Sequence, residues 1–218
     1  MKETIRAITH SLSATRGATY VAAAAPKDED DPSALLLYAW NARVSAAMMV
    51  PLHICEVVVR NAASDALEMV YGPLWPWSPG FERSLLAPAT GYSPQKDLQN
   101  ARRRQSTKGK VIPELNFVFW QKLFSSRYDK RIWDKHLKTV FPNLDQTKSV
   151  GQLRQGIHNS IGEIRILRNR IAHHEPIFKR DLRAELQRIV TLIEIRCKVT
   201  AAWLMDNQQA SAIIAQRP

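Results

Sequence analysis

The sequence predicts an all-α fold, a single helical bundle that spans residues 1–218. Apolar residues recur at spacings of three or four in several long segments, which is the period of amphipathic helices. Continuous strand-like alternation is absent, and no internal repeat is found. At 218 residues and 45% hydrophobic content, with eight glycines, the chain is large enough for one well-buried core. Nothing in it requires a second domain.

The first third of the chain predicts three helical segments. Residues 3–25 have high helix propensity, so we expect an N-terminal helix and turn over 1–30. A second helix should run from Ser33 to Met49. Pro51 should kink or restart it, since proline removes a helical hydrogen bond. The third segment then continues to Tyr71.

One face of the 33–49 helix is built mostly from small residues. They follow a near-heptad spacing, which lets a neighbouring helix approach closely. The members of this stripe are Leu35, Ala39, Ala42, Ala46 and Met49. We therefore expect a helix–helix contact on this face.

Residues 72–94 are rich in Pro, Gly, Trp and Ser and predict an irregular stretch with a short helix at Phe81–Leu86. Its aromatic residues Trp75, Trp77 and Tyr92 permit two interpretations. They can stack on unpaired bases, or they can anchor a long loop to the core. The composition favours the anchoring role.

The second half predicts three further helices. One begins at Pro113 and carries the core positions Phe117, Trp120, Leu123 and Phe124. A helix capped by Thr147 or Ser149 precedes Pro176, and a last helix covers Arg180–Met205. Residues 206–218 are expected to form a flexible tail.

The net charge and the cysteines indicate the kind of partner and the cellular compartment of the protein. The net charge of +11 indicates a polyanionic partner, with RNA or DNA ahead of membrane lipid. Cys55 and Cys197 both fall in helical apolar patterns and are predicted to be core residues of a protein in a reducing cytoplasm. We recognise neither a transmembrane run nor a signal sequence, so we expect no membrane partner.

A cluster of basic residues follows the irregular stretch. It lies at the end of a short helix and in the loop after it, and its T-K-G-K segment lacks the glycine spacing of a phosphate-binding P-loop. Such a run is often only a solvated face, but in a chain of this charge we expect it to contact the RNA backbone. The candidate RNA-binding residues are Arg102, Arg103, Arg104, Lys108 and Lys110.

The densest group of functional side chains is R-I-L-R-N-R-I-A-H-H-E-P, residues 165–176. A helical wheel places Arg168, Asn169 and His173 on the face opposite the apolar stripe, and Arg170 with His174 nearer its edge. Basic residues also gather at helix C-termini because they complement the dipole. However, an unprotonated histidine can accept a proton from a hydroxyl, and an arginine suits a phosphate that gains charge.

This segment resembles a known family. Arg168-Asn169-Arg170-Ile171-Ala172-His173 matches the R-x4-H motif of the HEPN ribonuclease superfamily, and L-R-N-R-I-A-H-H-E-P-I resembles its abortive-infection (Abi-like) branch. Y-A-W-N at 38–41 and E-V-V-V-R-N at 56–61 also look like that branch. The resemblance implies a HEPN-like up-and-down bundle with additional helices.

The resemblance also implies metal-independent RNA cleavage without a cofactor. His173 would act on the ribose 2′-hydroxyl, Arg168 would stabilise the charge on phosphorus, and Asn169 would orient the phosphate. His174 and Arg170 would support them. The products would be a 2′,3′-cyclic phosphate and a 5′-hydroxyl.

The residues Glu56, Arg60 and Asn61 permit two readings. Glu56 and Arg60 have the spacing of an intrahelical ion pair, which at a surface contributes little. In the light of the resemblance, all three are candidates for positioning the motif helix or contacting RNA.

The family further implies a homodimer in which two motif helices form one composite site. Phage defence through abortive infection, or a role as the toxin of a toxin–antitoxin pair held by an antitoxin protein or a structured RNA, follows from the same resemblance. One branch carries a tyrosine that its partner nucleotidylates two residues after the motif histidine. Glu175 occupies that position here, so we do not expect that form of control.

Other functions have less support in the sequence. A metal site from His173, His174 and Glu175 is disfavoured because neighbouring ligands on a helix splay apart. A serine or cysteine hydrolase would need a nucleophile elbow or an activated cysteine, and neither is recognisable. The main alternative is a non-catalytic dimeric adaptor that binds RNA or a nucleotide.

Overall fold

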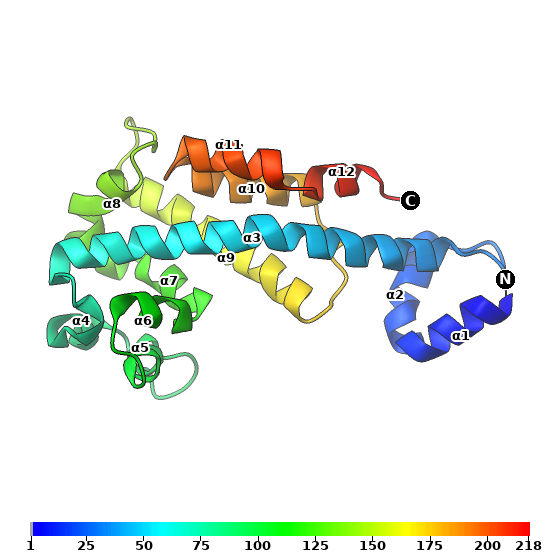
Figure 1. The fold of residues 1–218 in the computed structure, drawn as a ribbon, viewed down its shortest axis with the longest axis horizontal. Coiled ribbons are helices and arrows are strands. Elements are labelled where there is room, and N and C mark those ends of the chain that lie inside the picture. The colour runs from blue at the N-terminus through cyan, green and yellow to red at the C-terminus, as the bar shows by residue number, and fades with distance from the viewer. Residues whose placement is uncertain (1) are drawn as a thin grey trace.

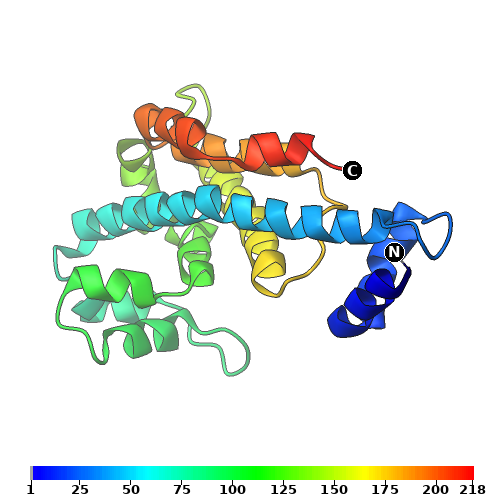
Figure 2. The ribbon, with the colours of Figure 1, turned by 45° about the vertical axis from the view of Figure 1, so that its right-hand side comes forward.

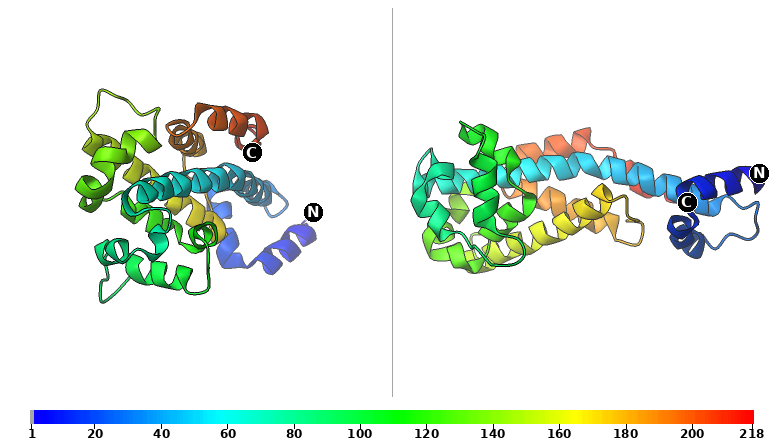
Figure 3. Two further views of the ribbon diagram at one scale, coloured as in Figure 1. Left: turned by 60° about the vertical axis from the view of Figure 1, so that its left-hand side comes forward. Right: turned by 90° about the horizontal axis from the view of Figure 1, so that it is seen from below.

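A single 39-residue helix, α3 (Ser33–Tyr71), forms the axis of the computed structural model, which describes residues 2–218 (Figure 1). Helices α4–α8 gather at its C-terminal end, α9–α12 lie along its length, and the pair α1–α2 lies at its N-terminal end (Figures 1 and 3). These residues contain helices and no β-strand. The predicted all-α fold is thereby confirmed.

The N-terminal segment forms two helices, α1 (Lys2–Leu12) and α2 (Ala14–Ala24), where one was predicted. The break lies at Ser13, which adopts a φ of 74° and accepts a hydrogen bond from the Arg16 N–H through its side chain. A serine in this role caps a new helix. Met1, included in the predicted N-terminal segment, lies outside the described residues.

The predicted restart of the helix at Pro51 is wrong. Helix α3 continues through this residue, and Figure 1 draws it as one unbroken ribbon. Pro51 is buried, as are Met48, Leu52 and Cys55 around it, so packing on both sides offsets the missing hydrogen bond. The predicted end is confirmed, since Gly72 follows α3 with a φ of 82°.

The elements at the C-terminal end of α3 are short. They are η1 (Trp75–Trp77), α4 (Pro79–Ser84), α5 (Pro94–Arg102), α6 (Lys108–Glu114), α7 (Phe117–Leu123), η2 (Ser126–Tyr128), the π-helical turn η3 (Asp129–Trp133) and α8 (Asp134–Val140). Pro113 lies inside α6 instead of starting a helix, and α7 begins after Asn116. The four predicted core positions of this region are all buried.

Aromatic side chains form the core at this end of the molecule. Trp75 is fully buried and donates its indole N–H to Ser64 Oγ at 3.1 Å. Its ring meets Trp120 edge to face at 6.2 Å, and Phe124 stacks on Trp133 at 4.3 Å. Trp75 therefore anchors the irregular segment, as the composition favoured.

The C-terminal part contains α9 (Val150–Ala172), α10 (Leu182–Glu194), α11 (Lys198–Asn207) and α12 (Ala210–Ala215). The predicted single helix over 180–205 is thus divided. Cys197 adopts extended angles in the turn and accepts a hydrogen bond from Thr200 N–H as the cap of α11. It is half-buried in that turn and is not a core residue, whereas Cys55 is fully buried.

The end of the chain is not a free tail in this structure. Helix α12 packs on α3 and α10, and Trp40 donates its indole N–H to Ile213 O at 2.7 Å. The guanidinium of Arg217 lies 5.7 Å from the centre of the Trp40 ring, a cation–π contact. These contacts hold the segment expected to be flexible.

Helix α3 is long and apolar enough to cross a membrane, with a mean hydropathy of 1.5 in its most apolar window. It also packs against α2, α7, α8, α9, α10 and α12, as the central helix of a bundle does. Length and composition alone do not separate these two cases. The absence of a membrane partner stays a prediction.

Candidate functional site

The candidate site lies at the C-terminal end of α9, whose position is set by its other end. Ser149, not Thr147, caps the helix in a reciprocal capping box with Gln152, which satisfies two N-terminal backbone donors. The apolar stripe then points into the core along the whole helix. All of its members are buried: Leu153, Ile157, Ile161, Ile164, Leu167 and Ile171.

The motif runs past the end of the helix. Helix α9 ends at Ala172, and His173 is its C-cap, with its N–H donating to Asn169 O at 2.9 Å. His174 has a φ of 55°, a left-handed conformation that reverses the chain direction. Figures 1 and 2 show this end of α9 standing apart from α10–α12, with the following loop crossing back to them. A helical wheel therefore does not describe His174.

Arg168, Asn169 and His173 are accessible from solvent. Arg168 and His173 are exposed and Asn169 is half-buried. The Arg168 guanidinium makes one hydrogen bond within the described residues, to Asn169 Oδ1 at 3.5 Å. Most of its donors are thus available to a ligand.

Arg170 and His174 have different surroundings from those that the wheel implied. Arg170 Nε lies 3.4 Å from Glu175 Oε2, and the Glu175 N–H donates to Arg170 O at 2.8 Å. The backbone oxygen of His174 accepts a hydrogen bond from Arg16 of α2 at 3.1 Å. The supporting residues therefore hold the turn after the helix.

Asn41 was not singled out as a site residue, yet it fixes this turn. Its side-chain oxygen accepts hydrogen bonds from the N–H groups of Ile177 at 2.9 Å and Phe178 at 3.2 Å, and it is only 6% exposed. The Y-A-W-N string was the available signal. Sequence alone did not show that its asparagine binds a backbone segment 136 residues away.

Two pockets flank the end of α9. One, of about 460 Å³, is lined by Glu56, Arg165, Arg168 and Asn169, together with residues of α6, α7 and the segment before α5. We call it the Glu56 pocket. The second, of about 570 Å³, is lined by His174 and residues of α2 and α3.

The structure thus places Glu56 beside the motif, but not Arg60 or Asn61. Glu56 is half-buried and makes no ion pair with Arg60 or with any other described residue. Arg60 and Asn61 do not line the Glu56 pocket. Of the three, Glu56 alone shares a cavity with Arg168.

The predicted basic cluster is partly neutralised within the protein. Arg102 pairs with Glu82 and donates to Pro76 O at 2.8 Å, and Lys108 pairs with Glu68. The side chains of the remaining three residues are exposed and make no hydrogen bond or ion pair within residues 2–218: Arg103, Arg104 and Lys110.

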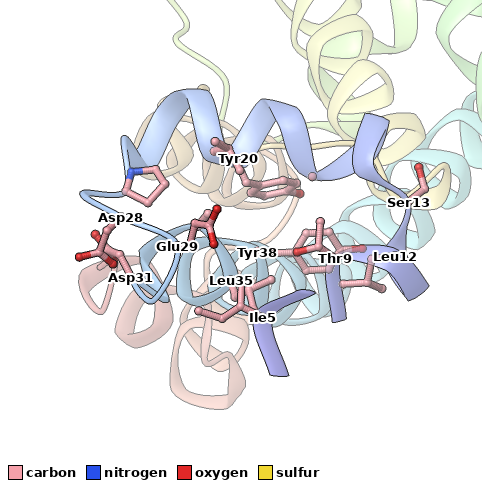
Figure 4. A pocket seen from close by; sticks show the side chains of 14 residues that line it. Ile5, Thr9, Leu12, Ser13, Tyr20, Asp28, Glu29, Asp31, Leu35 and Tyr38 are labelled. Atoms are coloured by element: carbon pink, nitrogen blue, oxygen red, sulfur yellow. The ribbon is translucent and has the colours of Figure 1, made fainter. Parts of the chain in front are cut away.

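A further cavity lies away from these residues. It occupies about 390 Å³ between α1, α2 and the start of α3, where Ile5, Leu12, Tyr20 and Leu35 form much of its lining (Figure 4). None of the predicted site residues lines it. Among residues 2–218, no group of three or more His, Cys, Asp or Glu side chains is arranged to hold a metal ion.

Comparison with known proteins adds no family. No protein-family model matches the chain, and no curated protein or solved structure matches it. The resemblance to the HEPN superfamily therefore rests on the motif residues, and the activity it implies is a proposal.

Proposed function

We propose that the protein is a metal-independent endoribonuclease of the HEPN type, with its reaction centre at Arg168, Asn169 and His173. The observation that carries the proposal is the state of these side chains at the end of α9. Two are exposed, and the guanidinium is bound only by its neighbour at 3.5 Å. Side chains that the fold does not use remain free for RNA.

In this mechanism the histidine begins the reaction and the arginine stabilises its charged stage. His173 accepts the proton of a ribose 2′-hydroxyl, whose oxygen attacks the adjacent phosphorus. Arg168 donates to the phosphoryl oxygens as negative charge accumulates on them, and Asn169 holds the phosphate. The P–O5′ bond breaks, and the departing oxygen takes up a proton to give a 5′-hydroxyl beside a 2′,3′-cyclic phosphate.

Charge supports RNA as the partner. The chain carries a net charge of +11, and Arg103, Arg104 and Lys110 have no acidic partner among the described residues. Free cations of this kind bind phosphates and release counterions. We assign the backbone-contacting surface to these three residues, with Arg102 and Lys108 in a structural role.

We further propose a homodimer that forms across α3. Four of the five members of the small-residue stripe are exposed: Ala39, Ala42, Ala46 and Met49. Ala42, Ala46 and Met49 also line the second pocket, beside His174. A second copy that docks on this face in a two-fold arrangement would place two motifs near each other.

The cellular role follows from the resemblance alone. We propose that the enzyme acts in the cytoplasm in abortive infection or as the toxin of a toxin–antitoxin pair. An antitoxin protein or a structured RNA would then hold it inactive.

The proposal is tested by RNA cleavage in EDTA, read on a denaturing gel. Wild type should cleave, and Arg168→Ala and His173→Ala should each lose about 100-fold or more of the rate. Arg131→Ala and His10→Ala, exposed residues of the same types away from the site, should retain it. Light scattering would show whether all variants keep the same oligomeric state.

Three outcomes are distinguishable in this experiment. Activity that survives both motif substitutions would contradict the mechanism. RNA binding without cleavage, by protein that carries no bound antitoxin protein or inhibitory RNA, would favour the non-catalytic adaptor. Normal cleavage by a monomeric wild-type protein would rule out the composite dimer site and would mean that one chain carries out the reaction.

A further inference from the structure

The Glu56 pocket combines groups that bind phosphate with groups that bind a base. Its 460 Å³ falls within the range of small-ligand sites. Arg165 and Arg168 of α9 provide cationic donors, whereas Glu56 of α3 and Glu114 of α6 provide carboxylate acceptors. An anionic phosphate is attracted to the arginines and repelled by the carboxylates. The acidic part therefore suits the uncharged part of a nucleotide.

One wall of the pocket is held in place by a partly buried hydrogen-bond network. Asp97 of α5 accepts hydrogen bonds from the Tyr92 hydroxyl at 2.6 Å and from Asn116 Nδ2 at 2.8 Å. Burial, followed by the bond to Asp97, raises the pKa of Tyr92, so its hydroxyl stays protonated and keeps donating. Two lining residues from separate loops are thus tied to one carboxylate.

The opposite wall is fixed through Arg165. Its Nε donates to Gln121 Oε1 of α7 at 2.9 Å, which leaves the terminal nitrogens for a ligand. Gly162 of α9 permits this approach, because a Cβ there would lie 2.8 Å from Gln121 Nε2. The arginine is therefore positioned before any ligand enters.

The carboxylates indicate what the pocket recognises. Neither Glu56 nor Glu114 has an ion-pair or hydrogen-bond partner among the described residues. A carboxylate accepts hydrogen bonds from base amino groups. Guanine offers adjacent N1–H and N2–H donors on its Watson–Crick edge, which match the two oxygens of one carboxylate, whereas uracil offers one N–H between two carbonyl acceptors.

We propose that the Glu56 pocket binds a nucleobase of the RNA beside the reacting phosphate and prefers guanine to uracil. Glu56 reads the Watson–Crick edge, since it is half-buried whereas Glu114 is exposed at the rim. Tyr92 is the one aromatic residue of the Trp75, Trp77 and Tyr92 set that lines the pocket, and its ring is placed to contact the base. This base specificity rests on the proposed function of the neighbouring motif.

The experiment measures nucleotide binding separately from cleavage. Dissociation constants of GMP and UMP are measured by calorimetry for wild type, Glu56→Gln and the control Glu194→Gln, an exposed glutamate that does not line the pocket. Wild type should bind GMP about 10-fold more tightly than UMP. Glu56→Gln should remove most of that preference, and Glu194→Gln, which lies outside the pocket, should retain it.

A second arm follows cleavage of RNA oligonucleotides that differ only by G or U at one position. Equal binding of the two nucleotides, or a preference that survives Glu56→Gln, would overturn the inference. Cleavage with no guanine preference would contradict the base pocket but leave the ribonuclease proposal intact. A GMP preference without any cleavage would support the pocket and contradict the proposed function.

Discussion

The two ends of α9 carry the same type of side chain in opposite situations. Near the N-terminal end, Arg154 is 5% exposed and donates to both carboxylate oxygens of Asp129, at 2.8 and 3.3 Å, and to Phe124 O at 3.2 Å. Near the C-terminal end, Arg168 is exposed and bonds only to its neighbour Asn169. The hydrogen-bond donors of Arg154 are satisfied within the protein, whereas most donors of Arg168 are not.

This difference separates basic side chains that the fold uses from those whose donors are available to a ligand. A buried guanidinium with satisfied donors holds elements together and has nothing left for a ligand. An exposed guanidinium contributes little to stability but can bind a phosphate. The same distinction divides the basic cluster, where Arg102 is paired and Arg103 is free.

The largest expected effect on stability is that of Arg154→Ala. Removing one partner of a buried ion pair leaves Asp129 without its cation and should cost about 3 kcal/mol of unfolding free energy. The midpoint of thermal unfolding should fall by roughly 6–12 °C. The matched change Arg168→Ala should alter it by less than about 0.5 kcal/mol. Equal losses in circular-dichroism melts would refute the comparison.

A smaller effect on stability is expected at the N-cap of α9. Ser149→Ala removes the side-chain half of the capping box and should cost about 1 kcal/mol. Chemical denaturation measures it through the midpoint concentration. Thr147→Ala serves as the control, because Thr147 bonds to Asp145 and not to the start of α9. A larger loss in the control would show that the cap was misassigned.

The smallest effect on stability is expected in the turn after the C-terminal end of α9. Glu175→Gln removes the ion pair with Arg170, in which both side chains are 40–50% exposed, and should change stability by less than about 0.5 kcal/mol. Denaturation midpoints of the variant and wild type should coincide. A loss above about 1 kcal/mol would mean that this turn is as firmly held as the helix start.

Periodicity predicted much of the fold. The stripe of α9 is buried at every predicted position, and Gly72 ends α3 as expected. Periodicity did not predict the helix breaks that tertiary contacts cause. The turn after α10 is held by Arg196, which donates to Val140 O and pairs with Asp65 of α3, partners that are remote in sequence.

The residues of the candidate site could be predicted from the sequence, but the residues that surround them could not. Spacing placed Arg168 and Asn169 on one accessible side of α9. It did not reveal the reversal at His174, the cap from Asn41 or the proximity of Glu56. These features depend on how α3 lies against α9, which no local pattern encodes.

The central proposal is that Arg168 and His173, at the C-terminal end of α9, cleave RNA without a metal ion. The most direct measurement is end-group analysis of RNA incubated with the wild-type protein in EDTA. We predict 2′,3′-cyclic phosphate and 5′-hydroxyl ends that disappear with His173→Ala. Products with 5′-phosphate and 3′-hydroxyl ends that require a divalent cation would contradict the account.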